Sequence, residues 1–359
     1  MNKLTLLFLL VITTVTTTLC FSKPRTDLLK VPPGFKIELF ASGLSNARTM
    51  VLGKQGTVFV GTRSAGKVYA IKSGKVYTIA QNLNMPNGIA FHNNALYIAA
   101  VDRILRLDNI EQNLANPPQA VVIRNNLPRA RHHGWRYIAF GPDGRLYISI
   151  GAPCNVCLKQ GFAEIRSMKA DGSDERTVAT GIRNSVGFTW HPQTKKLWLS
   201  DNGRDMLGDD IPADEINRVD KLGQDFGFPY CHGGNVPDPD YNEFPCSDFS
   251  PPIAKLGAHV APLGVTFYTG NNFPKKYQNQ LFVAEHGSWN RSKKSGYRVA
   301  MATLQGSKVI GYETFVSGWL QGQSAWGRPA YTLVMPDGSM LISDDRAGAI
   351  YRVTSIQGS

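Results

Sequence analysis

The same pattern of hydrophobic and polar residues recurs six times along the chain. Each copy begins with a polar turn, continues with a short run that is alternately or continuously apolar, and ends at a small or acidic residue. The segments "GTVFVGT", "DGRLYISIGAP" and "TKKLWLSDNG" are clear examples. Such runs predict short buried β-strands that end where a polar loop starts. The central residues of the six copies are Phe59, Tyr97, Tyr147, Trp198, Phe282 and Leu341.

The spacing of these copies indicates the fold. They are separated by roughly 40 to 85 residues, which suits the four-stranded blade of a β-propeller with inserted loops. The 35 glycines and 21 prolines favour many turns, and therefore short strands over long helices. We predict an all-β fold, a six-bladed β-propeller that is closed by pairing between the first and last segments. A pair of β-sandwiches is the alternative.

Length and charge narrow the range of partners. A chain of 359 residues is long enough to bury a full core. Its formal net charge of +12 favours a nucleic acid, an anionic surface or an anionic ligand. No run of lysine and arginine exceeds two residues, however, so the chain lacks the basic arm typical of many nucleic-acid-binding proteins. We therefore expect no nucleic-acid partner.

The N-terminal segment, "MNKLTLLFLLVITTVTTTLCFSKP", predicts export. One lysine precedes an apolar run from Leu4 to Val11, and small polar residues follow. This is the composition of a secretory signal peptide, and the run is too short and too rich in threonine to span a membrane. We predict that residues 1–21 are removed and that residues 22–359 form the propeller domain. The protein would then be periplasmic or secreted, with no stable membrane insertion.

Export changes how the cysteines are interpreted. Those that remain after the predicted cleavage are Cys154, Cys157, Cys231 and Cys246. An even number in an oxidising compartment predicts two disulfides, most simply 154–157 and 231–246. The rival interpretation of "CNVC" is a zinc site, but the motif lacks a second Cys or His pair at a suitable spacing. Leu158 stands where a c-type haem motif requires histidine, so no haem is predicted.

Basic residues recur at one position relative to separate strands. Each precedes an apolar strand that leads toward a turn, and they are Arg48, Arg136, Arg183 and Arg328. On equivalent strands of different blades, these side chains would form a cationic ring at the mouth of the central channel and favour a bound polyanion. Arginines solvated singly at the surface are the alternative. His132 and His133 lie just before Arg136, so the same mouth would also hold imidazoles.

The segment 200–219, "SDNGRDMLGDDIPADEINRV", concentrates carboxylates. It does not match an EF-hand, because the D-x-N-x-D-G spacing and the final glutamate are absent. Acidic side chains and exposed carbonyls beside Gly203 nevertheless suit Ca²⁺, and a solvated acidic loop is the alternative. In "AEHGSWNRS", His286 stands at a strand end close to Trp289, and an aromatic beside a polar site favours a sugar ring or a planar cofactor.

Five stretches, taken in order, resemble one family. They are "HHGWRYIAFGPDGRLYISIGAPCNVC", "GIRNSVGFTWHP", "SDNGRDMLGDDIPADEIN", "VAEHGSWNRS" and "GRPAYTLVMPDGSMLISDD". Together they resemble the soluble aldose and sorbosone dehydrogenases that depend on pyrroloquinoline quinone (PQQ). The resemblance extends from "VPPGFKIELFASGL" to "AIYRV". It implies an exported six-bladed propeller with PQQ and Ca²⁺ at the mouth of the channel.

The resemblance also implies roles for individual residues. A histidine before "RYIAFGPDG" is similar to the family's catalytic base, and its spacing from the following arginine leaves His132 and His133 both open. Arg183 and Asn184 look like the pair that contacts the quinone and orients the substrate oxygen. Backbone carbonyls at Gly203 would ligate calcium, together with those at Arg204.

The residues that would hold the PQQ carboxylates depart in part from the family pattern. Arg328 is similar to one of two arginines that grip these carboxylates, whereas Ala330 stands at the position of the second. His286 replaces a lysine that some members use. Arg48 is expected to compensate, and Arg136 is expected to contact the cofactor as well.

The chemistry of the family accounts for these residue types. PQQ carries three carboxylates, which explain a ring of arginines better than a neutral sugar does. Calcium would act as a Lewis acid on the quinone, and Arg183 would stabilise charge that develops there. A neutral imidazole would take the hydroxyl proton of a sugar, or of a sugar-derived aldehyde or alcohol, as its hydride leaves. Since the chain lacks a haem motif, the electrons would pass to an external acceptor such as a quinone or a cytochrome.

Two other functions fit the same architecture. A calcium-dependent lactonase would hold a central metal through carboxylate and asparagine side chains and would need few arginines. A non-catalytic propeller of the cell envelope would use a cationic mouth to hold an anionic partner. The departure at Ala330 also keeps open a family member that has lost the cofactor.

Overall fold

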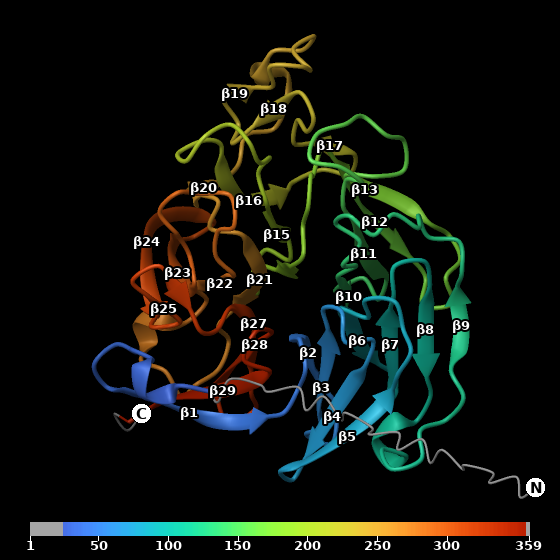
Figure 1. Ribbon diagram of the computed structural model, residues 1–359. Helices are drawn as coiled ribbons and strands as arrows, with labels where there is room; N and C mark the ends of the chain where they lie inside the picture. Colours follow the sequence, from blue (N-terminus) through green and yellow to red (C-terminus); the bar gives the residue numbers. More distant parts are fainter. Residues whose placement is uncertain (1–23, 357–359) are drawn as a thin grey trace, which may run out of the picture.

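The strands of the chain form blades around a central axis (Figure 1). The computed structural model describes residues 24–356. The predicted signal peptide, residues 1–21, lies outside the described residues. Six sheets of four or five strands make the blades, and the three inner strands of each follow one another in the chain. The six-bladed β-propeller is therefore confirmed, and the pair of β-sandwiches is excluded.

The first three blades follow one another along the chain. Blade 1 consists of β2(Ala47–Leu52), β3(Val58–Thr62), β4(Val68–Lys72) and β5(Lys75–Ala80). Blade 2 consists of β6(Gly88–His92), β7(Ala95–Ala99), β8(Ile104–Leu107) and β9(Val121–Arg124). Blade 3 consists of β10(Ile138–Phe140), β11(Leu146–Ile150), β12(Glu164–Met168) and β13(Arg176–Thr180), with β17(Gln224–Asp225) added in parallel at its outer edge.

The last three blades complete the ring. Blade 4 consists of β14(Phe188–Trp190), β15(Leu197–Asp201), β16(Ala213–Val219) and β20(Ala254–Ala258). Blade 5 consists of β21(Pro262–Phe267), β22(Leu281–Glu285), β23(Arg298–Gln305) and β24(Lys308–Val316). Blade 6 consists of β27(Pro329–Val334), β28(Met340–Asp344), β29(Ala349–Ser355) and β1(Phe35–Ser42).

Smaller elements decorate the loops. One two-stranded ribbon pairs β18(Cys231–His232) with β19(Val236–Pro237), and another pairs β25(Leu320–Gln321) with β26(Ser324–Ala325). Short 3₁₀ helices are η1(Thr26–Leu28), η2(Ile110–Gln112), η3(Cys246–Asp248) and η4(Lys275–Tyr277). The β18–β19 ribbon belongs to an extension that projects from the ring at the top of Figure 1.

The ring closes through its two ends, as the sequence predicts. Strand β1 pairs antiparallel with β29, with Phe35 opposite Ser355 and Ser42 opposite Ala349. Blade 6 therefore combines an outermost strand from the start of the chain with three strands from its end. The backbone N–H and C=O groups of β29 are paired on both sides, so this blade keeps no exposed edge there.

The six hydrophobic centres of the repeated pattern all lie on the second strand of a blade, on β3, β7, β11, β15, β22 and β28. Side chains alternate between the two faces of each strand, so one strand contributes to two cores. On β3, Phe59 packs toward blade 2, whereas Val58 and Val60 pack toward blade 6. The hydrophobic core thus lies between neighbouring blades around the whole ring.

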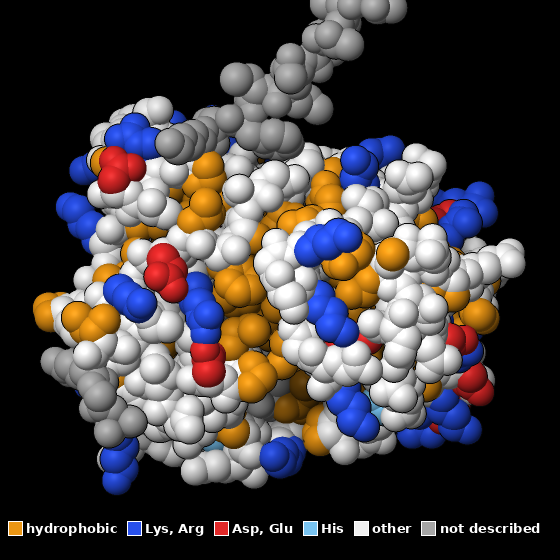
Figure 2. Space-filling model, turned by 90° about the horizontal axis from the view of Figure 1, so that it is seen from below, with side chains coloured by type: hydrophobic (Ala, Val, Ile, Leu, Met, Phe, Trp, Pro, Cys, Tyr) orange, Lys and Arg blue, Asp and Glu red, His pale blue; other side chains and the backbone are white. Residues whose placement is uncertain are grey.

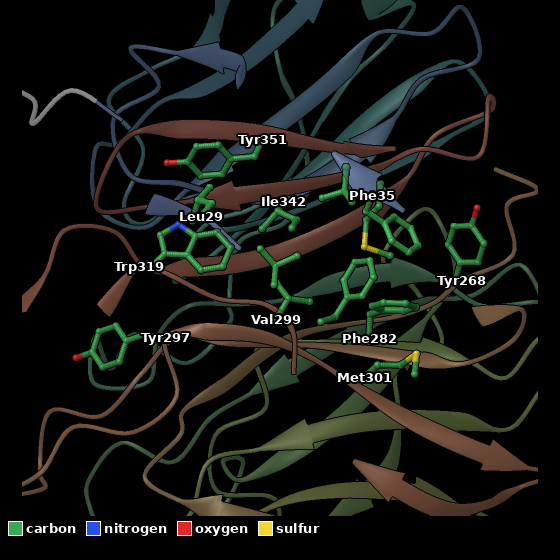
Figure 3. Packing of buried hydrophobic residues seen from close by; sticks show 14 of the residues in the cluster. Leu29, Phe35, Tyr268, Phe282, Tyr297, Val299, Met301, Trp319, Ile342 and Tyr351 are labelled. Carbon is green, nitrogen blue, oxygen red and sulfur yellow. The ribbon is translucent and has the colours of Figure 1, made fainter. Parts of the chain in front are cut away.

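The core between blades 5 and 6 shows how the closing strand is anchored (Figure 3). Phe35 of β1 packs edge-to-face against Phe273, with ring centroids 4.8 Å apart, and against Phe315, with centroids 5.3 Å apart. Such aromatic pairs add about 0.5–1.5 kcal/mol beyond the area they bury. The N-terminal strand is therefore held by side-chain packing as well as by its backbone hydrogen bonds.

The antiparallel pairing of the first two strands in a blade decides where the polar residues gather. The start of the first strand lies beside the end of the second, as where Ala47 pairs with Thr62 and Pro329 pairs with Asp344. Residues just before innermost strands and just after second strands consequently meet at one mouth of the ring. This arrangement brings together polar residues that are far apart in the sequence.

The positive charge of the chain is dispersed over the face seen in Figure 2. Lysine and arginine side chains are scattered over this face, with acidic side chains between some of them, and they form no continuous patch there. Within residues 24–356, no helix is both long and apolar enough to cross a membrane.

Candidate active site

A cavity of about 300 Å³ lies at the mouth where these strand ends meet. Residues from five blades line it, and blade 2 alone contributes none. The volume is at the lower end of the range typical of small-molecule sites. Of the predicted site residues, those that line the cavity are Arg48, His132, His133, Arg183, Asn184, Gly203, His286 and Arg328.

Three arginines, Arg48, Arg63 and Arg328, form what we call the cationic wall of the cavity. The guanidinium groups of Arg48 and Arg63 lie 5.1 and 5.6 Å from the ring centroid of Trp135. The Nη1 atom of Arg48 is buried and has no hydrogen-bond partner within the described residues. Because an unsatisfied buried donor costs free energy, this wall favours a ligand that brings negative charge.

The buried carboxylate of Asp345 orients Arg48 of the cationic wall. Asp345 accepts a hydrogen bond of 2.8 Å from Nε of Arg48 and another of 2.8 Å from Nε2 of His286. Burial opposes the ionisation of Asp345, but its contacts with His286 and Arg48 outweigh burial and hold its pKa well below the usual range. Burial lowers the pKa of His286 to about 3, so this imidazole is neutral and donates to the carboxylate.

Arg328 is fixed by backbone carbonyls. Its Nε donates to the carbonyl of His286 at 2.9 Å, and its Nη2 donates to the carbonyl of Gly287. The guanidinium also lies over the ring of Tyr297, 5.3 Å from the centroid. Burial lowers the pKa of Arg328, although an arginine remains charged in proteins. Its positive charge is therefore held at the cavity without a salt bridge to a carboxylate among residues 24–356.

The two histidines of the sequence motif lie in different environments. The side chain of His133 is buried and lines the cavity, and its Nδ1 donates to the carbonyl of Ala152 at 2.9 Å. Burial lowers the pKa of His133 well below its usual range, and the charge of Arg183 lowers it further. A neutral ring whose Nδ1–H is used in this way leaves Nε2 as a proton acceptor.

Local backbone geometry fixes this orientation of His133. His133 has a φ of +48°, in the left-handed region that residues other than glycine rarely adopt. Gly151, at the end of β11, approaches it so closely that an added Cβ would lie 2.7 Å from the Cβ of His133. The glycine therefore lets β11 support the imidazole directly.

His132 is exposed, although it also lines the cavity. Its ring packs edge-to-face on that of His133, with centroids 4.1 Å apart. Burial lowers the pKa of His132 and the charge of Arg183 lowers it further. No hydrogen bond within the described part of the chain fixes its ring, so the geometry favours His133 as the base.

The opposite side of the cavity, which we call the carboxylate side, contains Asp201, Asp205, Asp214 and Glu215. Asp205 and Asp214 line the cavity, and the other two are buried outside its lining. Asp201 accepts the backbone N–H groups of Arg183 and Asn184 at 2.9 and 2.6 Å. These carboxylates thus hold the loops that carry the predicted site residues.

Burial shifts the protonation of these groups. It raises the pKa of Asp214 to about 7, although the N–H groups of Gly203 and Ala261 oppose the shift. Burial also raises the pKa of Asp201 to about 8, with a further contribution from the charge of Glu215. The side therefore carries less negative charge near neutral pH than its composition implies.

Arg183 lies on this side of the cavity, and most of its guanidinium N–H groups donate to acceptors within the protein. Its Nε donates to the carbonyl of Asn155 at 2.9 Å, and its Nη1 donates to the carbonyl of Asn202 at 3.2 Å. Its Nη2 donates to Oδ1 of Asn155 at 2.7 Å and to Asp205 at 3.1 Å. Asn184 differs, because its buried Oδ1 has no partner among residues 24–356.

The two predicted calcium ligands, Gly203 and Arg204, lie in different environments in the structure. Gly203 lines the cavity and donates its N–H to Asp214 at 2.7 Å. Arg204 does not line the cavity, and its side chain forms a buried ion pair with Asp238, which also contacts His232. Within the described residues, no cluster of three or more His, Cys, Asp or Glu side chains is arranged to hold a metal ion.

The prediction that Arg136 contacts a cofactor needs correction. Its side chain is fully buried, does not line the cavity, and donates to the carbonyls of Val101 at 3.1 Å and Pro128 at 2.6 Å. Although Arg136 stands just before an innermost strand, it is turned into the loops around blade 2. Its geometry indicates that it holds these loops together.

Both cysteine pairs are bonded as the sequence predicts. Cys154 is linked to Cys157 with a Cα–Cα distance of 6.1 Å, and Cys231 is linked to Cys246 with a Cα–Cα distance of 5.3 Å. The first disulfide lies in the loop after β11, and the second closes the extension that carries β18 and β19.

Comparison with known proteins decides the family. The model of the glucose/sorbosone dehydrogenase family matches residues 93–287, more than half of the chain. The chain belongs to this glucose/sorbosone dehydrogenase family. A second family model, described as TrAA12-like, matches residues 234–355.

Relatives of this glucose/sorbosone dehydrogenase family member include an uncharacterised protein of Borreliella burgdorferi, 39% identical and covering 91% of each chain. The PQQ domain of pyranose dehydrogenase from Coprinopsis cinerea, in its holo form, has a TM-score of 0.78 at 20% identity and covers 93% of this chain and 98% of that one. A calcium structure of a family AA12 protein from Trichoderma reesei has a TM-score of 0.80 at 18% identity and covers 95% and 99%. At these identities, the two structures support the fold.

The residues present in this family member fit PQQ better than they fit calcium. The cationic wall offers charged donors, and Nη1 of Arg48 is without a partner at the cavity among the described residues. The unpartnered Oδ1 of Asn184 is an acceptor, so it suits a substrate hydroxyl or a cation and not a carboxylate. For calcium, a site would depend on backbone carbonyls such as that of Gly203, because the carboxylate of Asp214 is already occupied by two N–H groups.

Sequence reasoning missed several residues that line or support the cavity. They are Arg63, Asp205, Asp214, His259 and Asp345. Arg63 and Asp345 follow the second strands of their blades, at the same position as His286. The repeated pattern already marked this strand end, so reading the next residue of every copy would have found both. Asp205 and Asp214 lie in the acidic segment 200–219, which was noted only as a whole, and His259, in the short connection between β20 and β21, gave no such signal.

Proposed function

We propose that this protein is a PQQ-dependent dehydrogenase that oxidises a sugar or a sugar-derived alcohol or aldehyde. The observation that carries the proposal is one cavity that combines a cationic wall with the free Nε2 of a neutral His133. An acidic cofactor explains the first feature, and removal of a hydroxyl proton explains the second. The resemblance to PQQ-dependent enzymes and the family assignment support the same reaction class.

In this proposal the cationic wall binds the carboxylates of the cofactor. Arg48, Arg63 and Arg328 supply the charged N–H donors, and Trp135 supports two of the guanidinium groups. Charge-assisted hydrogen bonds of this kind are roughly twice as strong as neutral ones. When bound, PQQ supplies a quinone that accepts a hydride.

His133 acts as the general base. Its Nε2 takes the proton of the substrate hydroxyl as the hydride leaves the same carbon, and Nδ1–H stays hydrogen-bonded to Ala152. Arg183 and Asn184 lie on the same side of the cavity and orient the substrate oxygen. We propose that calcium assists the reaction through the backbone near Gly203, that the electrons leave to an external acceptor, and that the protein is exported.

Reconstitution tests this function. Purified protein is titrated with PQQ, with and without Ca²⁺, and the binding is followed by calorimetry. Dye reduction is then measured over a panel of aldoses, sorbosone-like aldehydes and alcohols. We expect saturable PQQ binding and dye reduction that depends on PQQ and on one class of sugar.

The same experiment separates the competing functions. A lactonase would hydrolyse lactones without PQQ, and a neutral lactone would leave the cationic wall without a charged partner. A binding propeller would bind an anion but reduce no dye with any substrate. Absence of PQQ binding at micromolar concentration would contradict the proposal.

A further inference from the structure

The loop closed by the Cys154–Cys157 disulfide is linked to residues of the cavity lining through Asn155. This residue lies inside the disulfide ring, one position after Cys154. Its side chain and its backbone carbonyl make four hydrogen bonds, all of them to Arg183 and Asp205. Both of these residues line the cavity.

The hydrogen bonds to Arg183 fix the plane of its guanidinium. The backbone carbonyl of Asn155 accepts Nε–H at 2.9 Å, and its side-chain Oδ1 accepts Nη2–H at 2.7 Å. Two acceptors on two different nitrogens define an orientation that one acceptor would leave free to rotate. Of the five N–H donors of Arg183, four donate to acceptors within the described residues, which leaves one N–H of Nη1 for a ligand.

The same asparagine also fixes Asp205. Its Oδ1 accepts the backbone N–H of Asp205 at 2.9 Å, and its Nδ2 donates to the backbone carbonyl of Asp205 at 3.0 Å. Asp205 in turn accepts a hydrogen bond from Arg183 at 3.1 Å. Asn155 is therefore shared by both members of an ion pair at the cavity.

The loop is tied to the candidate base as well. Ala152, which lies three residues before Asn155, donates its N–H to the carbonyl of Arg183 at 2.7 Å and accepts Nδ1–H of His133 at 2.9 Å. A short segment thus contacts His133 at one end and Arg183 at the other. The disulfide closes the chain directly after this segment and restricts the backbone of Asn155.

We propose that Asn155 is a positioning residue, and that the Cys154–Cys157 ring holds it so that Arg183 and Asp205 keep the geometry needed for turnover. This inference rests on the proposed function for its effect on turnover. Asn155 itself does not line the cavity, so it acts through Arg183 and Asp205. The cationic wall lies outside this network and should not depend on it.

The test compares variants of the full mature protein. Asn155→Ala removes the side-chain acceptor, and the double variant Cys154→Ser/Cys157→Ser opens the ring while keeping Asn155. Val156→Ala is the matched control, because it shortens the neighbouring side chain inside the same ring. Thermal unfolding of each variant establishes that the fold is retained, and Asn155→Ser replaces Asn155→Ala if the latter fails to fold.

The first measurement needs no cofactor. The side chain of Arg183 is only 3% exposed, so phenylglyoxal should modify it slowly in the wild-type protein. We expect modification of Arg183, followed by peptide mass mapping, to be several-fold faster in Asn155→Ala and in the double Cys variant. Arg48 serves as an internal reference and should react at an unchanged rate in all variants.

The second measurement separates positioning from binding. We expect kcat of Asn155→Ala to fall by about 10- to 100-fold, because a small misplacement of a substrate-orienting group has effects of this size. Its affinity for PQQ should stay near that of the wild type, and Val156→Ala should match the wild type in both measurements. Asn155→Asp, which keeps both oxygen acceptors for Arg183, should recover part of kcat.

The two outcomes that overturn proposals are distinct. Unchanged Arg183 labelling together with unchanged kcat in Asn155→Ala overturns the positioning role. Failure of the wild-type protein to bind PQQ or oxidise any sugar overturns the proposed function, and the labelling rates then still decide whether Asn155 orients Arg183.

Discussion

The two sides of the cavity carry opposite charges, and they differ in whether those charged groups already have partners within the protein. On the cationic wall, Arg63 has no ion pair within the described residues, and Arg48 keeps a nitrogen without a partner. On the carboxylate side, Asp201 and Asp214 each accept two backbone N–H groups. One side therefore offers unused donors to a ligand, whereas the other uses its charges to hold the loops that shape the site.

This difference predicts that one side of the cavity governs cofactor affinity and the other governs turnover and stability. Substitutions on the cationic wall should change the affinity for an acidic cofactor, because that wall has interactions left to form. Substitutions near the carboxylate side should change turnover or stability, because its interactions are already formed within the protein. The predictions that follow test this division, beginning with the largest expected effect.

The largest effect is expected for His133, whose pKa is lowered by burial and further by the charge of Arg183 on the carboxylate side. His133→Gln should reduce kcat by about 10²- to 10⁴-fold, since a positioned base contributes this much. PQQ affinity should change little, because the cationic wall remains intact. Steady-state dye reduction and PQQ titration of the variant measure the two effects separately.

His132→Gln is the control for this variant. Its side chain is exposed and makes no hydrogen bond within the described residues, so its kcat should stay close to that of the wild type. Near-parental turnover in both variants would falsify the assignment of a histidine base.

A stability effect is expected at the extension beside the carboxylate side. The Cys231–Cys246 disulfide closes a loop with a sequence separation of 15 residues, and Asp238 within this loop pairs with Arg204. Replacing both cysteines by serine should lower the free energy of unfolding by about 3 kcal/mol, from the entropy of loop closure. Urea denaturation measures this change, and labelling of the denatured, non-reduced wild type should find no free thiol among the four cysteines.

A smaller effect on binding is expected for Arg63. Arg63→Met keeps an apolar stem against Trp135 but removes the charge, so PQQ affinity should fall by about 10- to 100-fold with kcat at saturation nearly unchanged. Isothermal titration measures the affinity. The control is Arg103→Met, which removes an arginine that pairs with Asp102 at the surface. Equal losses in both variants would show that net charge, and not the wall, governs binding.

The smallest effect concerns pH and His286. Its pKa is lowered to about 3 by burial, so the unfolded chain binds a proton below about pH 6.5 that the folded chain does not bind. Stability from this group is therefore lost as the pH falls from about 6.5 toward 3, by about 1–2 kcal/mol at pH 5. Burial raises the pKa values of Asp201, Asp214 and Glu215, so the folded protein holds protons that the unfolded chain releases. Their contribution to stability is therefore lost as the pH rises, opposite to that of His286.

Urea denaturation at pH 5 and pH 7 isolates the histidine. His286→Gln keeps a donor for Asp345 but does not titrate, so it should lose less stability between pH 7 and pH 5 than the wild type does. An identical pH dependence of the two proteins would contradict a neutral buried His286.

The sequence predicted the fold well because the fold rests on a repeated local pattern. Each apolar run with its turn defines one second strand, and six such strands define a ring. The pairing of the first and last segments followed from the need to close that ring. Both disulfides followed from the number and spacing of the cysteines.

The site was predicted only in part, because loops and side-chain directions decide it. Arg48 lies at the start of the innermost strand β2 and Arg136 lies just before the innermost strand β10, yet of these two only Arg48 lines the cavity. Arg136 finds carbonyl acceptors at Pro128, eight residues earlier in the chain, and at Val101, 35 residues earlier. The role of Asn155 was hidden in the same way, since its partners come from other loops.

The closing strand has a consequence for how the protein is made. Phe35 pairs with Ser355, so the contacts that complete blade 6 have the largest sequence separation in the ring. Such non-local pairing slows folding, and here it must wait until the last strand has been synthesised. Blade 6 also carries Arg328 and Asp345, so the cationic wall is complete only after the ring has closed. Binding of the proposed acidic cofactor would therefore report that the chain, from its first strand to its last, has folded.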